Sequence, residues 1–243
     1  MYNGYMIQDS LAYADPMVEA PPAFQTAEEY AYRSLRGLIL AGKLQGGVKL
    51  NQDDLARRLN VSRTPIRQAV LRLENEGLVV NRPNRGATVT TLGPDGMLEL
   101  FEMRSVLEGL AFALAVPNID AKAVDEMQRR LDTLERSHTN ITRWVQLHDD
   151  FHGLMFQHAR RPRLSAQLSR LRQSVAPYLR LYLSTKKIAE MPGNEHRTLI
   201  EAIKVGDAVA AERMMREHVM YAAHELVEFI RAQDQGQLPP AGK

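Results

Sequence analysis

The chain has 243 residues, an apolar fraction of 44% and a net charge of +2, the profile of a globular protein with a buried core. It contains no cysteine, which excludes disulfides, thiolate zinc sites and cysteine nucleophiles and fits a reducing, cytoplasmic location. No stretch approaches the roughly 18 uninterrupted apolar residues that a membrane span needs, so we expect none.

Charge is distributed unevenly along the chain. Residues 31–91 hold eleven basic and four acidic residues, residues 1–30 hold five acidic and no basic residues, and residues 92–243 hold twenty of each. A basic segment beside a larger neutral one is expected when only one part of a protein meets a polyanion. Chance segregation of solvated surface charge would give the same pattern. Charge alone therefore does not show whether this segment binds a polyanion.

Residues 1–25 are predicted to be an extension that precedes the first domain. They contain Pro16, Pro21 and Pro22, and no Lys or Arg occurs before Arg33. The basic region of a signal peptide and the arginines of a transit peptide are therefore missing. We expect this extension to be disordered or loosely docked.

Residues 26–42 predict the first helix, because Thr26 is followed three residues later by Glu29 in a capping-box pattern. A second helix is expected from Asn51 to Asn60. Asparagine tolerates the left-handed conformation that a tight turn between helices needs.

A third helix is expected directly afterwards, from its N-cap Ser62 to Gly77. Two short helices joined by a tight turn predict a helix-turn-helix, whose second helix presents its first residues to DNA bases. These residues are Ser62, Arg63, Thr64 and Arg67. Arg63 and Arg67 have no acidic residue at helical spacing, so we expect both to be unpaired.

Two short strands are expected next, at residues 79–80 and 87–90, with a turn at residues 83–86. Such a hairpin forms a wing beside the helix-turn-helix. Arg82 and Arg85 lie near its tip, in position to contact phosphate or the minor groove.

The stretch SRTPIRQAVLRLENEGLV, followed by RGATVT, resembles the winged helix-turn-helix of the GntR family of bacterial transcription regulators. The resemblance covers roughly residues 26–91 and implies that Arg63, Thr64, Arg67 and Gly86 contact operator DNA. Some family members carry a basic or polar DNA contact two residues before the leucine equivalent to Leu55. That position is Asp53 here, so the resemblance transfers no role to it.

Residues 92–232 are nearly all helical in pattern and predict an antiparallel all-α bundle, which makes the whole protein mainly α. A flexible tail is expected at residues 233–243. The expected helices are residues 95–116, 119–137, 141–158, 164–184 with a bend near Pro177, 195–207 and 207–232.

Four histidines are the chemically informative residues of this bundle. His148 and His152 lie four residues apart on one helix face, His196 is near the start of the fifth helix and His218 is in the sixth. If these helices converge, their imidazoles would suit zinc, nickel or a similar divalent ion. Spacing alone says little about His196 and His218, and ordinary polar or core histidines are the alternative.

The segments EMRSVLEGLA, DDFH, EHRTLIEAI and DAVAAERMMREH, in this order, resemble the FCD ligand-binding domain that follows one branch of GntR winged helices. The resemblance implies a divalent metal bound by His152, His196 and His218. His148 stands where the family usually has a carboxylate, so a site of four histidines is expected. Asp149, three residues before His152, is the alternative ligand.

Arg104 has two interpretations. It lies four residues before Glu108, so the two side chains can form an ion pair on one helix face. Alternatively, its guanidinium clamps the carboxylate of a bound effector inside the bundle, which the family resemblance favours.

These features predict a homodimeric transcription regulator, a repressor, that binds palindromic double-stranded operator DNA and responds to a small organic acid bound with the metal. We do not expect an enzyme. One alternative is a metal sensor, in which the ion itself is the effector. Another is a metalloenzyme fused to a DNA-binding module, for which no general base can be identified.

Overall fold

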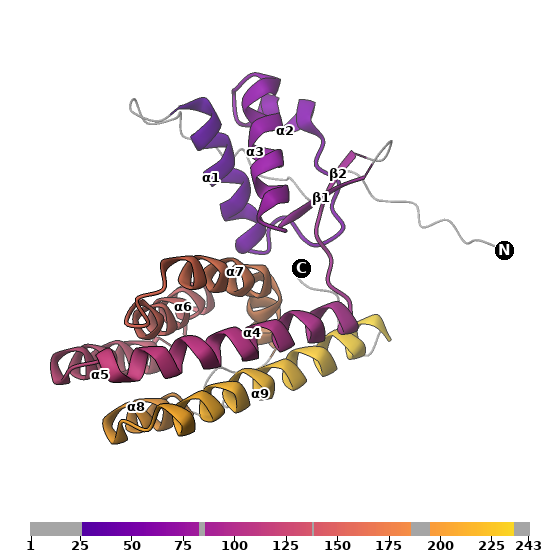
Figure 1. Cartoon of the computed structure of the whole chain (residues 1–243). Coiled ribbons are helices and arrows are strands. Elements are labelled where there is room, and N and C mark those ends of the chain that lie inside the picture. The colour runs from indigo at the N-terminus through magenta and orange to yellow at the C-terminus, as the bar shows by residue number, and fades with distance from the viewer. Residues whose placement is uncertain (1–25, 83–85, 138, 186–194, 236–243) are drawn as a thin grey trace. The chain divides into compact units, whose positions relative to one another are not determined.

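The structure is a computed structural model that describes residues 26–82, 86–137, 139–185 and 195–235 (Figure 1). The predicted N-terminal extension, Arg85 and most of the predicted tail lie outside these residues. The chain divides after Thr91 into two compact units. Each unit has its own hydrophobic core.

The first unit is a helix-turn-helix with a wing. In its described residues it consists of α1 (Ala27–Leu40), α2 (Gln52–Arg58), α3 (Arg63–Asn75), β1 (Val79–Arg82) and β2 (Gly86–Val89). The strands pair antiparallel, with Val79 opposite Val89 and Arg82 opposite Gly86. The core includes Leu35, Ile39, Ile66 and Leu73, each at most 1% exposed, so one face of α3 is buried while the other is open.

Local sequence explains where these helices begin. The Thr26 hydroxyl accepts a hydrogen bond from the Glu29 amide at 3.2 Å, and the Asn51 side chain caps α2. α2 ends two residues before the predicted end, and Asn60 adopts the expected left-handed conformation with φ of 50°. Ser62 occupies the N-cap position of α3, but its side chain makes no capping hydrogen bond.

The second unit is a helical bundle throughout its described residues. Its elements are α4 (Pro94–Ala115), the short 3₁₀ helix η1 (Val116–Asn118), α5 (Ala121–Arg136), α6 (Ile141–Gln157), α7 (Pro162–Thr185), α8 (Glu195–Val205) and α9 (Ala208–Asp234). α4 and α9 run side by side in opposite directions (Figure 1). The predicted antiparallel bundle is thus confirmed.

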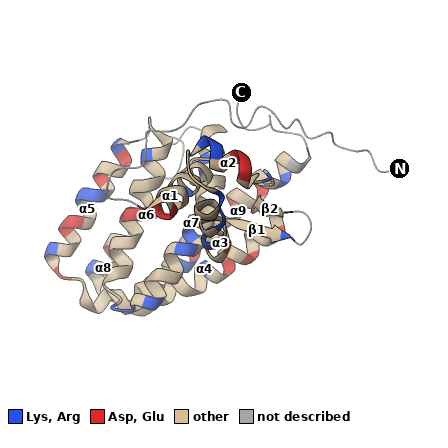
Figure 2. Cartoon of the chain, turned by 90° about the horizontal axis from the view of Figure 1, so that it is seen from above, with Lys and Arg blue, Asp and Glu red and all other residues tan. Residues whose placement is uncertain are grey.

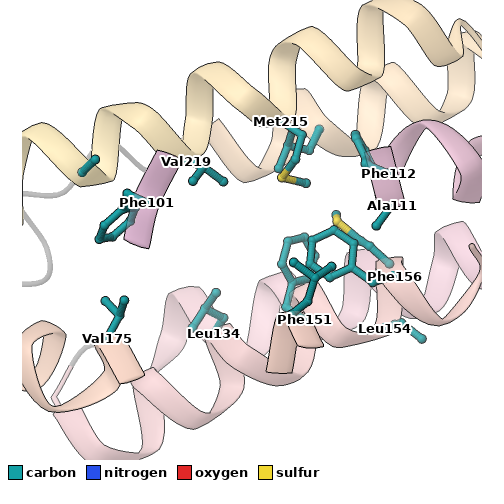
Figure 3. Packing of buried hydrophobic residues seen from close by; sticks show 14 of the residues in the cluster. Phe101, Ala111, Phe112, Leu134, Phe151, Leu154, Phe156, Val175, Met215 and Val219 are labelled. Atoms are coloured by element: carbon teal, nitrogen blue, oxygen red, sulfur yellow. The ribbon is translucent and has the colours of Figure 1, made fainter. Parts of the chain in front are cut away.

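The core of the bundle lies between α4 and α9 on one side and α6 and α7 on the other. Phe112 of α4 and Met215 of α9 face Phe151 and Phe156 of α6, and Phe101 of α4 lies across from Val175 of α7 (Figure 3). Burial of such large apolar side chains is the main force that holds the helices together. It also encloses any polar side chain that points between them.

Gly109 lets α4 and α9 approach closely. A Cβ atom at this position would lie 2.7 Å from Cγ of Arg216, which is too close for real atoms, and in tight contact with Cγ of Glu212 at 3.2 Å. Arg216 and Glu212 form an ion pair on α9, so neither side chain can swing away without breaking it.

We expect Gly109→Ala to lower the thermal unfolding midpoint of the full-length chain, because overpacking of this kind costs about 1–3 kcal/mol. Gly153→Ala in α6 is the matched control. No atom lies within 4 Å of a Cβ built at Gly153, so its replacement should raise the midpoint through better helix propensity. Equal shifts in both variants would contradict the close α4–α9 contact.

Candidate metal centre and nucleic-acid interface

Four histidines from three helices meet inside the second unit. His148 and His152 come from α6, His196 from α8 and His218 from α9, and one ring nitrogen from each lies within 4.8 Å of the others. The ring centroids of His148 and His152 are 4.7 Å apart, as expected for side chains one helical turn apart. Trp144 stacks on His148 at 4.9 Å and walls the cluster on one side.

Burial keeps three of these imidazoles, those of His148, His152 and His196, neutral. Loss of solvent, with smaller effects from charged neighbours, lowers the pKa of His148 and His152 well below its usual value. The same causes lower the pKa of His196 to about 3. A neutral imidazole offers the lone pair that a metal ion needs, so the site does not have to release protons first.

Several ring nitrogens of the cluster lack hydrogen-bond partners among the described residues. Neither nitrogen of His152 has one, although the side chain is 2% exposed, and Nε2 of His196 is also unpartnered. Buried polar atoms are nearly always satisfied in folded proteins. The four imidazoles therefore fit a divalent ion that accepts nitrogen ligands.

Glu195 supports His218 from outside the cluster. Its Oε2 lies 3.0 Å from Nδ1 of His218, so the other nitrogen, Nε2, is the one available to a metal. Sequence reasoning missed this residue. Glu195 and His218 are 23 residues apart, on different helices, and no local spacing relates them.

Asp149, the alternative ligand to His148, lies outside the group of four histidines and contacts Arg172. Its Oδ1 lies 2.7 Å from Nη2 and 2.8 Å from Nε of Arg172, a buried residue of α7. Nη2 of Arg172 also donates to the Asp149 carbonyl oxygen at 2.8 Å. Arg172 needs this carboxylate as a counter-ion, which holds Asp149 away from the cluster.

Arg104 is buried within the bundle and forms the ion pair that helical spacing predicts. Its Nε lies 2.7 Å from Oε1 of Glu108, whose side chain is fully buried. The charge of Arg104 is the smallest of the effects that lower the pKa of His148, after burial and the charges of His196, Arg172 and His218. Oε2 of Glu108 has no hydrogen-bond partner among the described residues.

The predicted DNA-contacting residues of α3 lie on its open face. Ser62, Arg63, Thr64 and Arg67 are exposed, and so are Arg82 and Gly86 of the wing. Gly86 has φ of 79°, a conformation that favours glycine at the end of the hairpin turn.

The prediction that Arg63 is unpaired was wrong. Its Nε lies 2.8 Å from Oδ1 of Asp53, which α2 contributes across the turn. Spacing within α3 could not reveal an acid from another helix. Basic and acidic residues also neighbour each other along α2 itself (Figure 2), where Asp54 pairs with Arg57 and Arg58.

Comparisons with known proteins agree with this architecture. The family model described as bacterial regulatory proteins of the gntR family matches residues 27–89, and the FCD domain model matches residues 99–220. The chain belongs to the GntR family and carries an FCD domain. It is therefore a DNA-binding transcription regulator. The metalloenzyme alternative is set aside because the relatives of this chain are named as transcriptional regulators.

Among the relatives of this GntR-family chain is the uncharacterized HTH-type transcriptional regulator YdhC of Bacillus subtilis. It is 26% identical over 80% of this chain and 88% of its own. The HTH-type transcriptional repressor RspR of Escherichia coli is 25% identical over 85% and 90%. The solved structure of E. coli McbR/YncC shares the fold with a TM-score of 0.70, at 23% identity, over 84% and 99%.

No helix in the described parts of the chain combines the length and the apolar character that crossing a membrane requires.

The buried histidines predict a pH dependence of stability for the metal-free protein. In the unfolded chain they take up protons near pH 6.5, whereas in the folded chain their lowered pKa keeps them neutral. The unfolded state then binds more protons, so the free energy of unfolding should fall as pH drops below about 6.5.

This dependence can be measured as the thermal midpoint between about pH 8 and pH 5 in the presence of chelator. We expect His196→Ala to flatten the slope, because one buried imidazole is removed. His224→Ala, which changes an exposed histidine of α9, should keep the wild-type slope. A wild-type midpoint that is constant over this range would refute the neutral cluster.

Proposed function

We propose that this regulator is a homodimeric repressor whose binding to a palindromic operator is controlled by a divalent metal and a small organic acid in the helical domain. The observation that carries the proposal is the convergence of His148, His152, His196 and His218. Neutral imidazoles from three helices favour zinc, nickel or a similar ion. Binding would tie α6, α8 and α9 together at one point.

The charge balance of the site supports an anionic effector. Histidine ligands bring no negative charge, so they leave the two positive charges of a divalent ion uncompensated, and Glu195 contacts His218 from outside the cluster. A carboxylate bound beside the metal would supply further negative charge. Arg104 uses its Nε for Glu108, and its outer nitrogens are then available to such a carboxylate.

A hydrogen bond suggests how the site could communicate with the DNA-binding unit. The amide of Leu92, the first residue of the second unit, donates to the hydroxyl of Tyr178 on α7 at 2.5 Å. α7 also carries Arg172, whose charge acts on three of the four histidines. An effector that binds one arrangement of α7 more tightly would therefore bias the segment leading to the winged helix.

A metal sensor is the second candidate. Four histidines are enough to complete the tetrahedral sphere of zinc, and such a site keeps no open position for an organic acid. In that case the ion alone would change operator binding.

Metal content tests the site directly. We expect the wild-type protein, purified without chelator, to contain about one divalent ion per chain by elemental analysis. His196→Ala should lose most of it, because it removes one of four ligands, whereas His224→Ala should retain it. Wild-type protein that is free of metal, and whose thermal midpoint zinc and nickel salts leave unchanged, would disprove the site.

The same protein distinguishes the two candidates when its operator binding is measured with a panel of dicarboxylic and tricarboxylic acids. Release by an acid only in the metal-loaded protein supports the effector model, whereas release by metal alone supports the sensor. The paired variant Arg104→Gln/Glu108→Gln should lose the response to acid while it keeps the metal. Changing both residues avoids leaving Glu108 buried without its partner.

We expect substitutions of the predicted DNA-contacting residues to reduce DNA affinity in two different ways. On a duplex selected from a random library, Arg67→Ala should cost about 1–3 kcal/mol of binding and relax the preference for one base. Arg82→Ala should weaken binding to all sequences and reduce the salt slope by about one, because it removes a phosphate contact. Mobility shifts at several salt concentrations measure both effects, and Arg136→Ala in the helical domain should change neither.

A further inference from the structure

Asp53 and Arg63 connect the two helices of the helix-turn-helix at its open edge. Nε of Arg63 lies 2.8 Å from Oδ1 of Asp53, with the side chains 72% and 59% exposed. Both residues line a shallow hollow of about 500 Å³ together with Arg57 and Ser62. Exposed ion pairs contribute little to folding. Stability therefore does not account for this pair.

Local electrostatics explain why the pair forms. The Asn51 cap fixes Asp53 in the first turn of α2, where the helix dipole favours an acid. Arg63 is the first residue of α3, where the dipole disfavours a cation, and the first turn of α3 contains no acidic residue. Asp53 supplies the missing negative charge from the neighbouring helix, and the guanidinium is held at one place.

We propose that Asp53 is a specificity-determining residue that positions Arg63 for base recognition. This rests on the proposed function of Arg63 as a base-reading residue. The ion pair engages Nε, the inner nitrogen, so the two outer nitrogens can face O6 and N7 of a guanine. An arginine already held in place loses less conformational freedom on binding. Exclusion of water by the duplex also strengthens the ion pair.

Asp53 has a second effect, which acts against incorrect sequences. Where Arg63 finds no acceptor on a base edge, the ion pair still loses water on approaching the DNA, and no base contact offsets this loss. Asp53 therefore lowers affinity for unrelated DNA more than affinity for the operator. The quantity that it raises is the ratio of the two affinities, which is the measure of specificity.

Asp54 is a charge-matched control on the same helical turn. It pairs with Arg57 and Arg58 of its own helix and makes no ion pair with α3 among the described residues. Asp54→Asn removes one negative charge from α2, as Asp53→Asn does. A general gain in attraction for DNA would appear in both variants. A change in specificity should appear in Asp53→Asn alone.

The experiment compares the dissociation constants of the full-length protein for a duplex selected by the wild type and for a scrambled duplex of equal length, at one salt concentration. We expect Asp53→Asn to reduce the ratio of the two affinities about tenfold, mainly by tighter binding to the scrambled duplex. Asp54→Asn should shift both constants by the same factor. Selection repeated with Asp53→Asn should lose the preference for one base in each half-site.

A double-mutant cycle ties the effect to Arg63, because Asp53→Asn should not change the ratio further in an Arg63→Ala background. If Asp53→Asn only shifts both constants as Asp54→Asn does, the inference is overturned while base reading by Arg63 stands. If Asp53→Asn lowers the ratio as much in the Arg63→Ala background as in the wild type, Asp53 does not act through Arg63. That result also overturns the inference. If Arg63→Ala leaves the ratio and binding to the selected duplex unchanged, the proposed function of Arg63 fails, and the role of Asp53 with it.

Discussion

The helical domain is organised around imidazole rings that are kept neutral inside an apolar bundle. Desolvation suppresses protonation of His148, His152 and His196, and the described structure provides no hydrogen-bond partner for several of their nitrogens. An unsatisfied buried polar atom costs about 1–3 kcal/mol. The bundle carries this cost because its large apolar core (Figure 3) includes Phe151 and Phe156, whose rings lie against His152.

Buried positive charge in the same domain is handled by pairing. Arg104 contacts Glu108 within α4, and Arg172 contacts Asp149 across α6 and α7. A buried cation without a partner would be strongly destabilising, and each of these arginines has its own carboxylate. The pairing also divides the acids of the region, because Asp149 serves Arg172 while Glu195 contacts His218. The group of possible metal ligands therefore consists of the four histidines.

In the DNA-binding unit, by contrast, most of the positive charge is exposed. The arginines of α2, of the open face of α3 and of the wing are exposed to water, which screens their charges and weakens their ion pairs. The pairs that Asp54 makes with Arg57 and Arg58 can rearrange when DNA replaces water, and the buried face of α3 keeps that helix in place. One chain therefore contains a dry, neutral site suited to a cation and a wet, basic surface suited to a polyanion.

Much of this organisation could be predicted before the structure. Helix starts at Thr26 and Asn51, the left-handed Asn60 and the paired strands of the wing follow from interactions within a few residues. The shared face of His148 and His152 follows from helical geometry. These features are local, and local chemistry is written directly in the order of residues.

What the amino-acid sequence determined by itself is the set of elements, the basic character of one unit and the family that its motifs resemble. Tertiary structure decided which distant side chains meet. It brought His196 and His218 to the α6 pair, drew Asp149 to Arg172, placed Glu195 behind His218 and set Asp53 against Arg63. These contacts have no characteristic spacing in the sequence. The packing of whole helices creates them, and the number of residues between two partners does not predict whether they meet.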